Sequence, residues 1–418
     1  MSGRIKTFWR SIGPGVITGA VDDDPGGIAT YTIAGTQHGY ATLWMMFFIL
    51  PFMIALQEMS ARIGAISGCG LTGNIKRHYP AWILSLAAIA ILVANVFNIG
   101  ADVYGMAGAL NLLVPLNIEF MAIALSILMV IITIKLRYKT IVSIFKWLAF
   151  TLFAYAIALG IIHPDWGLIL KNTFLPTIHF NKEFLTLLFA LVGTTISPYL
   201  YFWQASEEAE EVRLQNPRVR ICKPRDISEL KLHMIDRDTI LGMVFSNVIS
   251  FAIIALAAAT LYQNGLGHIE TLRDAAQALR PIAGNYAVWL FTIGVLGAGL
   301  LSIPILAGSA AYVLAEMFNW KGSLDSTFGH ARKFYLTMVI SVALGLLVPF
   351  IGITPVQALF YSGIVNGAIS PILILLIIHM ANNSDIVGEH RSRWGIRALG
   401  YISFILMTAG TLFVFATL

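Results

Sequence analysis

Three consecutive aspartates, at 22–24, lie inside the first long apolar segment of the chain, and Pro25, Gly26 and Gly27 follow them directly. On insertion scales, each aspartate that faces lipid costs about 2.5–3.5 kcal/mol. The proline removes a backbone donor, and the glycines accept conformations that other residues avoid, so a regular helix is interrupted here. Acids beside a broken helix are tolerated at membrane depth only where they line a polar cavity. This pattern therefore predicts a cation site inside a membrane protein.

The composition is that of an α-helical membrane protein. Hydrophobic residues make up 57% of the chain and charged residues 12%, which is about half the charged share of a soluble protein. The ten-residue alternating segments of a membrane β-barrel do not occur. We predict a single all-α transmembrane domain over residues 1–418, in contact with membrane lipid. The eleven expected spans are 12–38, 40–63, 82–110, 117–136, 141–162, 184–211, 239–263, 285–317, 333–350, 356–380 and 396–417.

Basic residues predict the orientation of these spans. With the N-terminus in the cytoplasm and the C-terminus outside, 22 of the 27 lysines and arginines fall on the cytoplasmic side. So uneven a distribution agrees with the positive-inside rule and predicts a multi-pass protein of the cell membrane. Because the bases are spread among the loops, the net charge of +5 does not indicate a nucleic-acid partner.

Several functional classes lack support in the sequence. No nucleotide-binding loop, serine nucleophile elbow or zinc-protease motif occurs, so we expect neither an enzyme, nor an ATP-driven pump, nor a protein with a cofactor. Cys69 and Cys222 have no partner at metal-ligand spacing, and we expect neither a zinc site nor a disulfide.

A second break lies five spans after the first, where Thr194, Thr195, Ile196 and Ser197 precede Pro198. Paired interruptions in two halves of a chain are typical of transporters whose binding site lies at the midplane. We therefore predict two inverted repeats of five helices each, with helices 1 and 6 broken and an eleventh helix appended. The approximate bounds are 12–162 for the first repeat, 184–380 for the second and 396–417 for the extra helix.

The two breaks together predict an oxygen-lined cation site. A broken helix leaves backbone carbonyls free on one side and amide donors free on the other. Asp24, directly before the first break, is the best candidate for a direct ligand, and carbonyls and hydroxyls of the sixth span complete the cage. Asp22 and Asp23 point in other directions, so that one lines the pathway while the other reaches a polar partner. The alternative interpretation is a triplet in a water-exposed loop.

Other polar residues in the spans are candidates for the pathway. In the third span, Asn98 and Asp102 share one helix face with Asn95. In the tenth span, Asn366 shares one face with Ser362 and Ser370. An acid inside a membrane is a functional candidate by default, whereas the asparagines also suit helix packing. In the second span we expect Gln57 and Glu58 to pair with Arg62. The acidic stripe over 204–211 is either a vestibule for cations or a solvated helix end.

These motifs resemble those of the natural resistance-associated macrophage protein (NRAMP) family of divalent metal transporters. Gly13-Pro14-Gly15 and, eight residues later, Asp24-Pro25-Gly26 are similar to the first-helix signature of the family. The segments at 56–64 and 101–113 resemble the end of its second helix and its third helix. The resemblance covers most of the chain and implies a LeuT-type inverted-repeat fold with alternating access.

Five positions depart from the family's pattern. Gly27 stands in place of the asparagine of Asp-Pro-Gly-Asn, and Ser197-Pro198-Tyr199 stands in place of Met-Pro-His. Asp102 matches a glutamate, and Gly363 matches a glutamine. Since the family's histidine is replaced by Tyr199, a further pathway candidate, proton coupling is in question.

The departures favour a harder cation. A thioether is a soft ligand, whereas Mg²⁺ prefers oxygen and usually keeps several waters. Gly27 would supply room for a partly hydrated ion, and the Thr194 carbonyl and Ser197 hydroxyl would complete the cage around Asp24. These replacements resemble the NRAMP-related magnesium transporters, so our leading expectation is a transporter of Mg²⁺ and also Mn²⁺. The alternatives are an ordinary proton-coupled Mn²⁺/Fe²⁺ transporter, an aluminium-transporting relative, a cation channel and, least favoured, an amino-acid symporter.

Overall fold

The computed structural model describes residues 13–135, 140, 150–215, 221–324 and 326–417. Within these ranges every regular element is a helix, which confirms the predicted all-α class. Nine helical stretches of the described residues are long and apolar enough to cross a membrane. One of these stretches, Pro25–Ser67, is continuous and contains most of the two expected spans 12–38 and 40–63. The first part of the expected fifth span, 141–149, lies outside the described residues.

The long helices match the expected spans closely. Each break divides one span into two helices, so the first span is α2 with α3 and the sixth is α11 with α12. The bounds are α2 Pro14–Asp22, α3 Pro25–His38, α4 Leu43–Ser67, α6 Ala81–Asn111, α7 Ile118–Lys135, α9 Phe153–Ile161, α11 Lys182–Thr195, α12 Pro198–Gln215, α13 Glu229–Ala257, α16 Ala287–Phe318, α17 Arg332–Gly345, α18 Pro355–Asn382 and α20 Trp394–Thr417.

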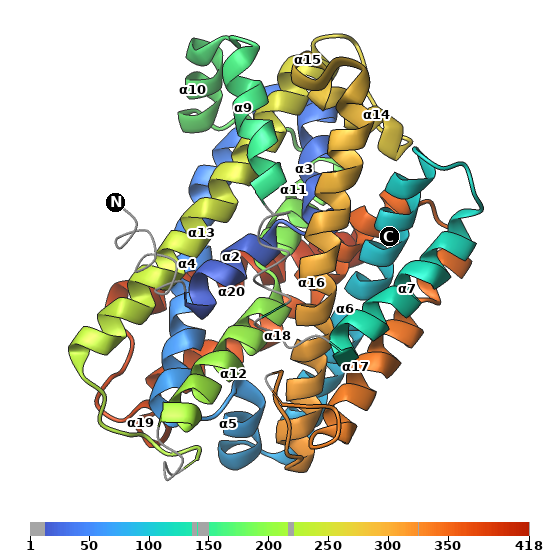
Figure 1. Cartoon of the computed structure of the whole chain (residues 1–418). Coiled ribbons are helices and arrows are strands. Elements are labelled where there is room, and N and C mark those ends of the chain that lie inside the picture. The colour runs from blue at the N-terminus through green and yellow to red at the C-terminus, as the bar shows by residue number, and fades with distance from the viewer. Residues whose placement is uncertain (1–12, 136–139, 141–149, 216–220, 325, 418) are drawn as a thin grey trace, which may run out of the picture.

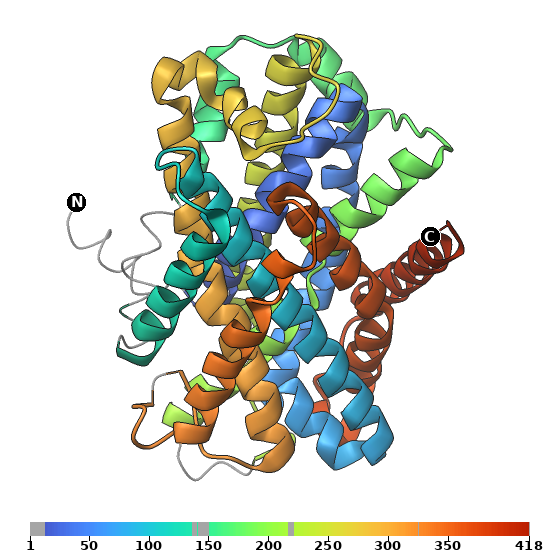
Figure 2. The same cartoon turned by 90° about the vertical axis from the view of Figure 1, so that its right-hand side faces the viewer.

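Short helices gather at the two ends of the bundle. Figure 1 shows α10 (Trp166–Phe174), α14 (Leu272–Ala276) and α15 (Arg280–Ala283) at one end, and α5 (Leu71–His78) and α19 (Ser384–Val387) at the other. The view turned by 90° shows the same long axis (Figure 2), and Figure 1 shows α2 near the middle of the molecule and α12 between it and the end that carries α5. The long helices therefore run between two caps of short helices and enclose both breaks.

Glycines let the helix that carries the aspartates approach α13 at backbone distance. A Cβ atom built on Gly19 would lie 2.0 Å from the carbonyl oxygen of Gly242, and one built on Gly242 would lie 2.0 Å from that of Gly15. Any side chain at these positions would force the two helices apart. Close approach of this kind is typical of helix packing in membranes, and it seats the end of α2 firmly against α13.

A buried ion pair joins α4 to α13. The Arg62 guanidinium donates hydrogen bonds to both Asp236 carboxylate oxygens, at 2.8 and 2.5 Å. Its Nε atom also lies 3.2 Å from Glu58, as the sequence predicts. The expected partnership of Gln57 with Arg62 is wrong, because Gln57 donates instead to the Leu200 carbonyl and the Gln204 side chain of α12. These contacts connect α4 with α13 and with α12.

Candidate metal site between two broken helices

The first break falls at the aspartates. Helix α2 ends at Asp22, and α3 begins at Pro25, with Asp24 as its N-cap residue. One Asp24 carboxylate oxygen accepts the Gly27 amide at 2.7 Å. Asp-Pro is a favourable helix start, because the carboxylate satisfies a free amide and proline fits the first turn. The capping of α3 thus holds the Asp24 carboxylate at the positive end of a half-helix.

The second break falls where the sequence predicts it. Helix α11 ends at Thr195, and α12 begins at Pro198. Ile196 and Ser197 lie between the two half-helices. The Ser197 hydroxyl donates to the Thr194 carbonyl at 2.6 Å. The two oxygen atoms proposed as ligands from this helix are therefore adjacent. A carbonyl oxygen with one donor keeps a second lone pair, and the hydroxyl oxygen keeps its acceptor capacity.

Tyr199 connects the two breaks. Its hydroxyl lies 3.3 Å from the second Asp24 oxygen and 3.4 Å from the Val21 carbonyl oxygen at the end of α2. The Tyr199 carbonyl in turn accepts a hydrogen bond from Ser309 of α16 at 3.2 Å. The pathway candidate that replaces the family's histidine is therefore in direct contact with the candidate ligand.

Asp22 and Asp23 face α13. Ser246 donates to Asp22 at 2.7 Å, and Ser250 donates to Asp23 at 3.0 Å. Both acids thus reach a polar partner, whereas the sequence predicts this of one. The other oxygen of each carboxylate, Asp22 Oδ1 and Asp23 Oδ2, has no hydrogen-bond partner among the described residues. The sequence analysis did not predict the contacts with Ser246 and Ser250. These two serines are four residues apart in an apolar span, so they share one helix face, and this pattern was an available signal for a polar contact.

The candidates from the third and tenth spans form two further pairs. Ser302 of α16 donates to Asp102 at 2.7 Å, and Asp102 lies close enough to Asp24 for the two carboxylates to interact electrostatically. Asn98 and Asn366 are hydrogen-bonded to each other, with a distance of 2.7 Å between Asn98 Nδ2 and Asn366 Oδ1. The asparagine pair joins α6 to α18, so the structure supports the packing interpretation for it.

The two glycines that depart from the family's pattern differ in how much space surrounds them. A Cβ atom on Gly27 would meet the Tyr31 ring at 3.2 Å and the Asp22 carbonyl oxygen at 3.3 Å, so both neighbours would have to shift by a few tenths of an ångström to admit it. A Cβ atom on Gly363 would lie 2.8 Å from the Ala190 carbonyl oxygen of α11, and one on Gly193 would lie 2.0 Å from the Gly363 carbonyl oxygen. Gly363 therefore serves close packing between α11 and α18, and glutamine does not fit at this position.

The site is enclosed on all sides. All ten residues predicted for it are buried, and Asp24 is only 4% exposed. In the part of the chain that the structure describes, no three His, Cys, Asp or Glu side chains gather as a metal cluster. The oxygen atoms described at the two breaks belong to a carboxylate, a carbonyl and a hydroxyl, which are donor types that suit hard divalent ions.

A bundle of membrane-spanning helices in which two broken helices meet at a buried carboxylate has the architecture of a secondary transporter. The family profile described as "Natural resistance-associated macrophage protein-like" matches residues 15–417. The chain therefore belongs to the Nramp family.

Curated relatives match over nearly the full chain. The divalent metal cation transporter MntH of Caldanaerobacter subterraneus subsp. tengcongensis is 26% identical over 414 residues, which covers 98% of this chain and 93% of that protein. The MntH protein of Bacillus subtilis is 24% identical and covers 99% of this chain and 94% of the relative.

Solved structures confirm the LeuT-type fold. The Eremococcus coleocola manganese transporter superposes with a TM-score of 0.73 at 17% identity, over 97% of this chain and 86% of that one. Mhp1, a nucleobase-cation-symport-1 family transporter, superposes with a TM-score of 0.59 at 13% identity, over 97% and 93% of the two chains.

Proposed function

We propose that this protein transports divalent metal cations by alternating access, with Asp24 as the direct ligand. The observation that carries the proposal is the meeting of the two breaks, where the Asp24 carboxylate caps α3 and contacts Tyr199 of α12. Carbonyl and hydroxyl oxygens of Thr194 and Ser197 complete the coordination, directly or through water. Because the site is buried in the middle of the bundle, an ion reaches it only if the helices open on one side at a time.

Mn²⁺ is the first candidate substrate. The relatives described above are named divalent metal cation transporters or a manganese transporter. These names support transport of Mn²⁺, as in an ordinary Nramp protein, more than they support transport of Mg²⁺. We place the N-terminus in the cytoplasm and the C-terminus outside on the basis of the basic loops.

Mg²⁺ is the second candidate, and two positions favour it. Gly27 and Ser197 remove the amide and thioether that the family's pattern supplies, which leaves an oxygen-only cage. Such a cage does not discriminate against hard ions in the way that a soft ligand does.

Competition in proteoliposomes tests the proposed function and separates the two substrates. Uptake of Mn²⁺ is measured with added Mg²⁺ or Ca²⁺, with and without a pH gradient, and with an internal pH dye. Saturable Mn²⁺ uptake with internal acidification identifies the ordinary Nramp activity. Uptake that Mg²⁺ blocks, without acidification, identifies the magnesium activity. If neither ion enters above empty vesicles, the proposal is wrong.

The double variant Gly27→Asn/Ser197→Met should raise the preference for Mn²⁺ over Mg²⁺ about tenfold, which corresponds to about 1.4 kcal/mol of differential binding. The physical reason is that it installs one amide oxygen and one soft thioether beside Asp24. The measurement is the ratio of the two inhibition constants. Gly27→Ala/Ser197→Ala is the matched control, because it changes the volume without adding a ligand. An equal shift in the control would contradict the soft-ligand explanation.

A further inference from the structure

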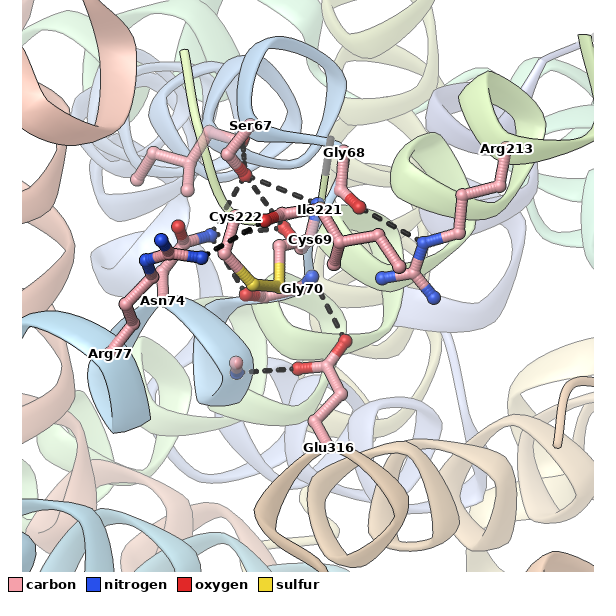
Figure 3. The surroundings of a disulfide bond; sticks show 12 residues. Ser67, Gly68, Cys69, Gly70, Asn74, Arg77, Arg213, Ile221, Cys222 and Glu316 are labelled. Atoms are coloured by element: carbon pink, nitrogen blue, oxygen red, sulfur yellow. Dashed lines mark hydrogen bonds between the residues drawn. A yellow bond between two sulfur atoms is a disulfide. The ribbon is translucent and has the colours of Figure 1, made fainter. Parts of the chain in front are cut away.

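A disulfide joins the end of α4 to the connection between α12 and α13, contrary to the sequence expectation. Cys69 lies between α4 and α5, and Cys222 lies in the connection from α12 to α13 (Figure 3). Their Cα atoms are 4.9 Å apart, within the range of natural disulfides, although 153 residues separate them in the chain. Sequence spacing says nothing about such proximity, because only the helix packing brings the two positions together.

Gly73 lies in the first turn of α5. Because it has no side chain, it leaves room for the two sulfur atoms. A Cβ atom there would lie 2.5 Å from the Cys69 sulfur and 3.4 Å from the Cys222 sulfur. The Gly73 and Gly70 amides are held by the Glu316 carboxylate of α16, at 2.8 and 2.9 Å. The start of α5 is thus fixed beside the bridge.

Three arginines surround the bridge and join the same segments. Arg213, near the end of α12, donates to the Gly68 carbonyl at 3.0 Å, and Arg225 donates to the Ala65 carbonyl at 2.8 Å. These carbonyls belong to the last turn of α4, where intrahelical partners are lacking. From α5, Arg77 donates to the carbonyl of Ile221 at 3.2 Å. Polar contacts and the disulfide therefore fasten the α12–α13 connection to the end of α4.

Helix α12 carries the effect of this attachment to the metal site. It begins at Pro198, beside Tyr199 and Asp24, and its 18 residues span about 27 Å toward the bridge. Along the way it packs on α4 at backbone distance, since a Cβ atom on Gly64 would lie 2.1 Å from the Ala205 carbonyl oxygen. The disulfide joins the end of α4 to the connection that follows α12, so it opposes any movement of that connection away from α4.

The environment of the bridge allows reversible chemistry. Cys69 is 2% exposed, whereas Cys222 is half-buried and follows the exposed Ile221. A small thiol therefore reaches the Cys222 sulfur first and displaces Cys69 as the thiolate. The basic loops place this end in the cytoplasm, where thiols are normally kept reduced.

We propose that Cys69 and Cys222 form a redox-controlled tether that slows metal transport when oxidised. In the reduced state, α12 and α4 separate at their ends and the site opens. Under oxidation the two thiols lose two protons and two electrons and form the S–S bond. These two electrons and two protons reduce hydrogen peroxide to two waters, or a small-molecule disulfide to two thiols. The proposal rests on the transport function proposed above.

The test uses the full-length protein in proteoliposomes with Mn²⁺ as the probe ion. Wild type and the Cys69→Ser, Cys222→Ser and double variants are treated with dithiothreitol or with oxidised glutathione, and thiols are counted by alkylation and mass spectrometry. We expect oxidised wild type to take up Mn²⁺ several-fold more slowly than reduced wild type, with unchanged equilibrium binding of Mn²⁺. All three variants should transport at the reduced rate under both treatments.

Hydrogen exchange separates failure of this inference from failure of the proposed function. Oxidation should slow amide exchange in the second half of α12 in wild type and leave it unchanged in the double variant. Absence of Mn²⁺ uptake in both redox states, with this exchange difference present, would overturn the transport function alone. Two free thiols after oxidation, equal exchange in both states, or equal uptake from confirmed disulfide and dithiol forms would each overturn the tether.

Discussion

Replacing Asp24 with alanine should reduce saturable metal uptake at least about a hundredfold, because even residues that only orient a metal ligand are worth about 10–100-fold in affinity. Asp24 contacts both breaks, through its own helix cap and through Tyr199. Uptake of Mn²⁺ into proteoliposomes measures the effect. Asp24→Ala also removes the N-cap of α3, so a second variant, Asp24→Asn, is needed to separate loss of the charge from loss of the cap.

Asparagine at this position still accepts the Gly27 amide and preserves the helix start, while it removes the carboxylate charge. Asp24→Asn should therefore retain the thermal stability of wild type and lose uptake as severely as Asp24→Ala. Glu270→Ala, at an exposed acid distant from the breaks, serves as the control and should transport normally. Wild-type uptake by Asp24→Asn would show that the carboxylate is not the ligand.

The second large effect concerns stability. Arg62→Gln should destabilise the protein by about 3–5 kcal/mol, the usual cost of removing one partner from a buried ion pair. The change leaves two carboxylates, Asp236 and Glu58, without the arginine that lies between them. Thermal unfolding of the protein in detergent, followed by fluorescence, should show a fall in the midpoint of several degrees.

Asp236→Asn provides the matched comparison. It leaves Arg62 with Glu58 at 3.2 Å, so its effect should be smaller than that of Arg62→Gln. The double variant Arg62→Met/Asp236→Leu should recover part of the loss, since apolar replacement of a buried pair is often neutral or stabilising. Equal midpoints for wild type and Arg62→Gln would mean that the pair contributes nothing to holding α4 against α13.

The sequence was enough to predict the helices and both breaks, for identifiable reasons. Apolar length fixes membrane spans, and Asp24-Pro25 and Ser197-Pro198 each contain a helix stop followed by a favourable helix start. The structure places each break at the residues predicted for it. The pairing of Glu58 with Arg62 was likewise predictable, because residues four apart on a helix are neighbours.

Contacts between distant segments were not predictable in the same way. Ser246 and Ser250 hold Asp22 and Asp23 because Gly19 lets α2 approach α13 closely, which no local pattern reveals. The Cys69–Cys222 bridge depends on how the connection after α12 folds back on α4. Gly363 matches a glutamine of the family's pattern, yet here its lack of a side chain is required by packing against α11. Each case depends on a backbone approach across the bundle.

The central claim is that a divalent cation binds between the two breaks, and anomalous X-ray scattering from crystals soaked in Mn²⁺ tests it most directly. The account predicts a strong anomalous peak beside the Asp24 carboxylate, close to the Thr194 carbonyl and the Ser197 hydroxyl, and its loss in Asp24→Asn crystals. A peak confined to the acidic stripe of α12, over residues 204–211, with none at Asp24 would contradict it.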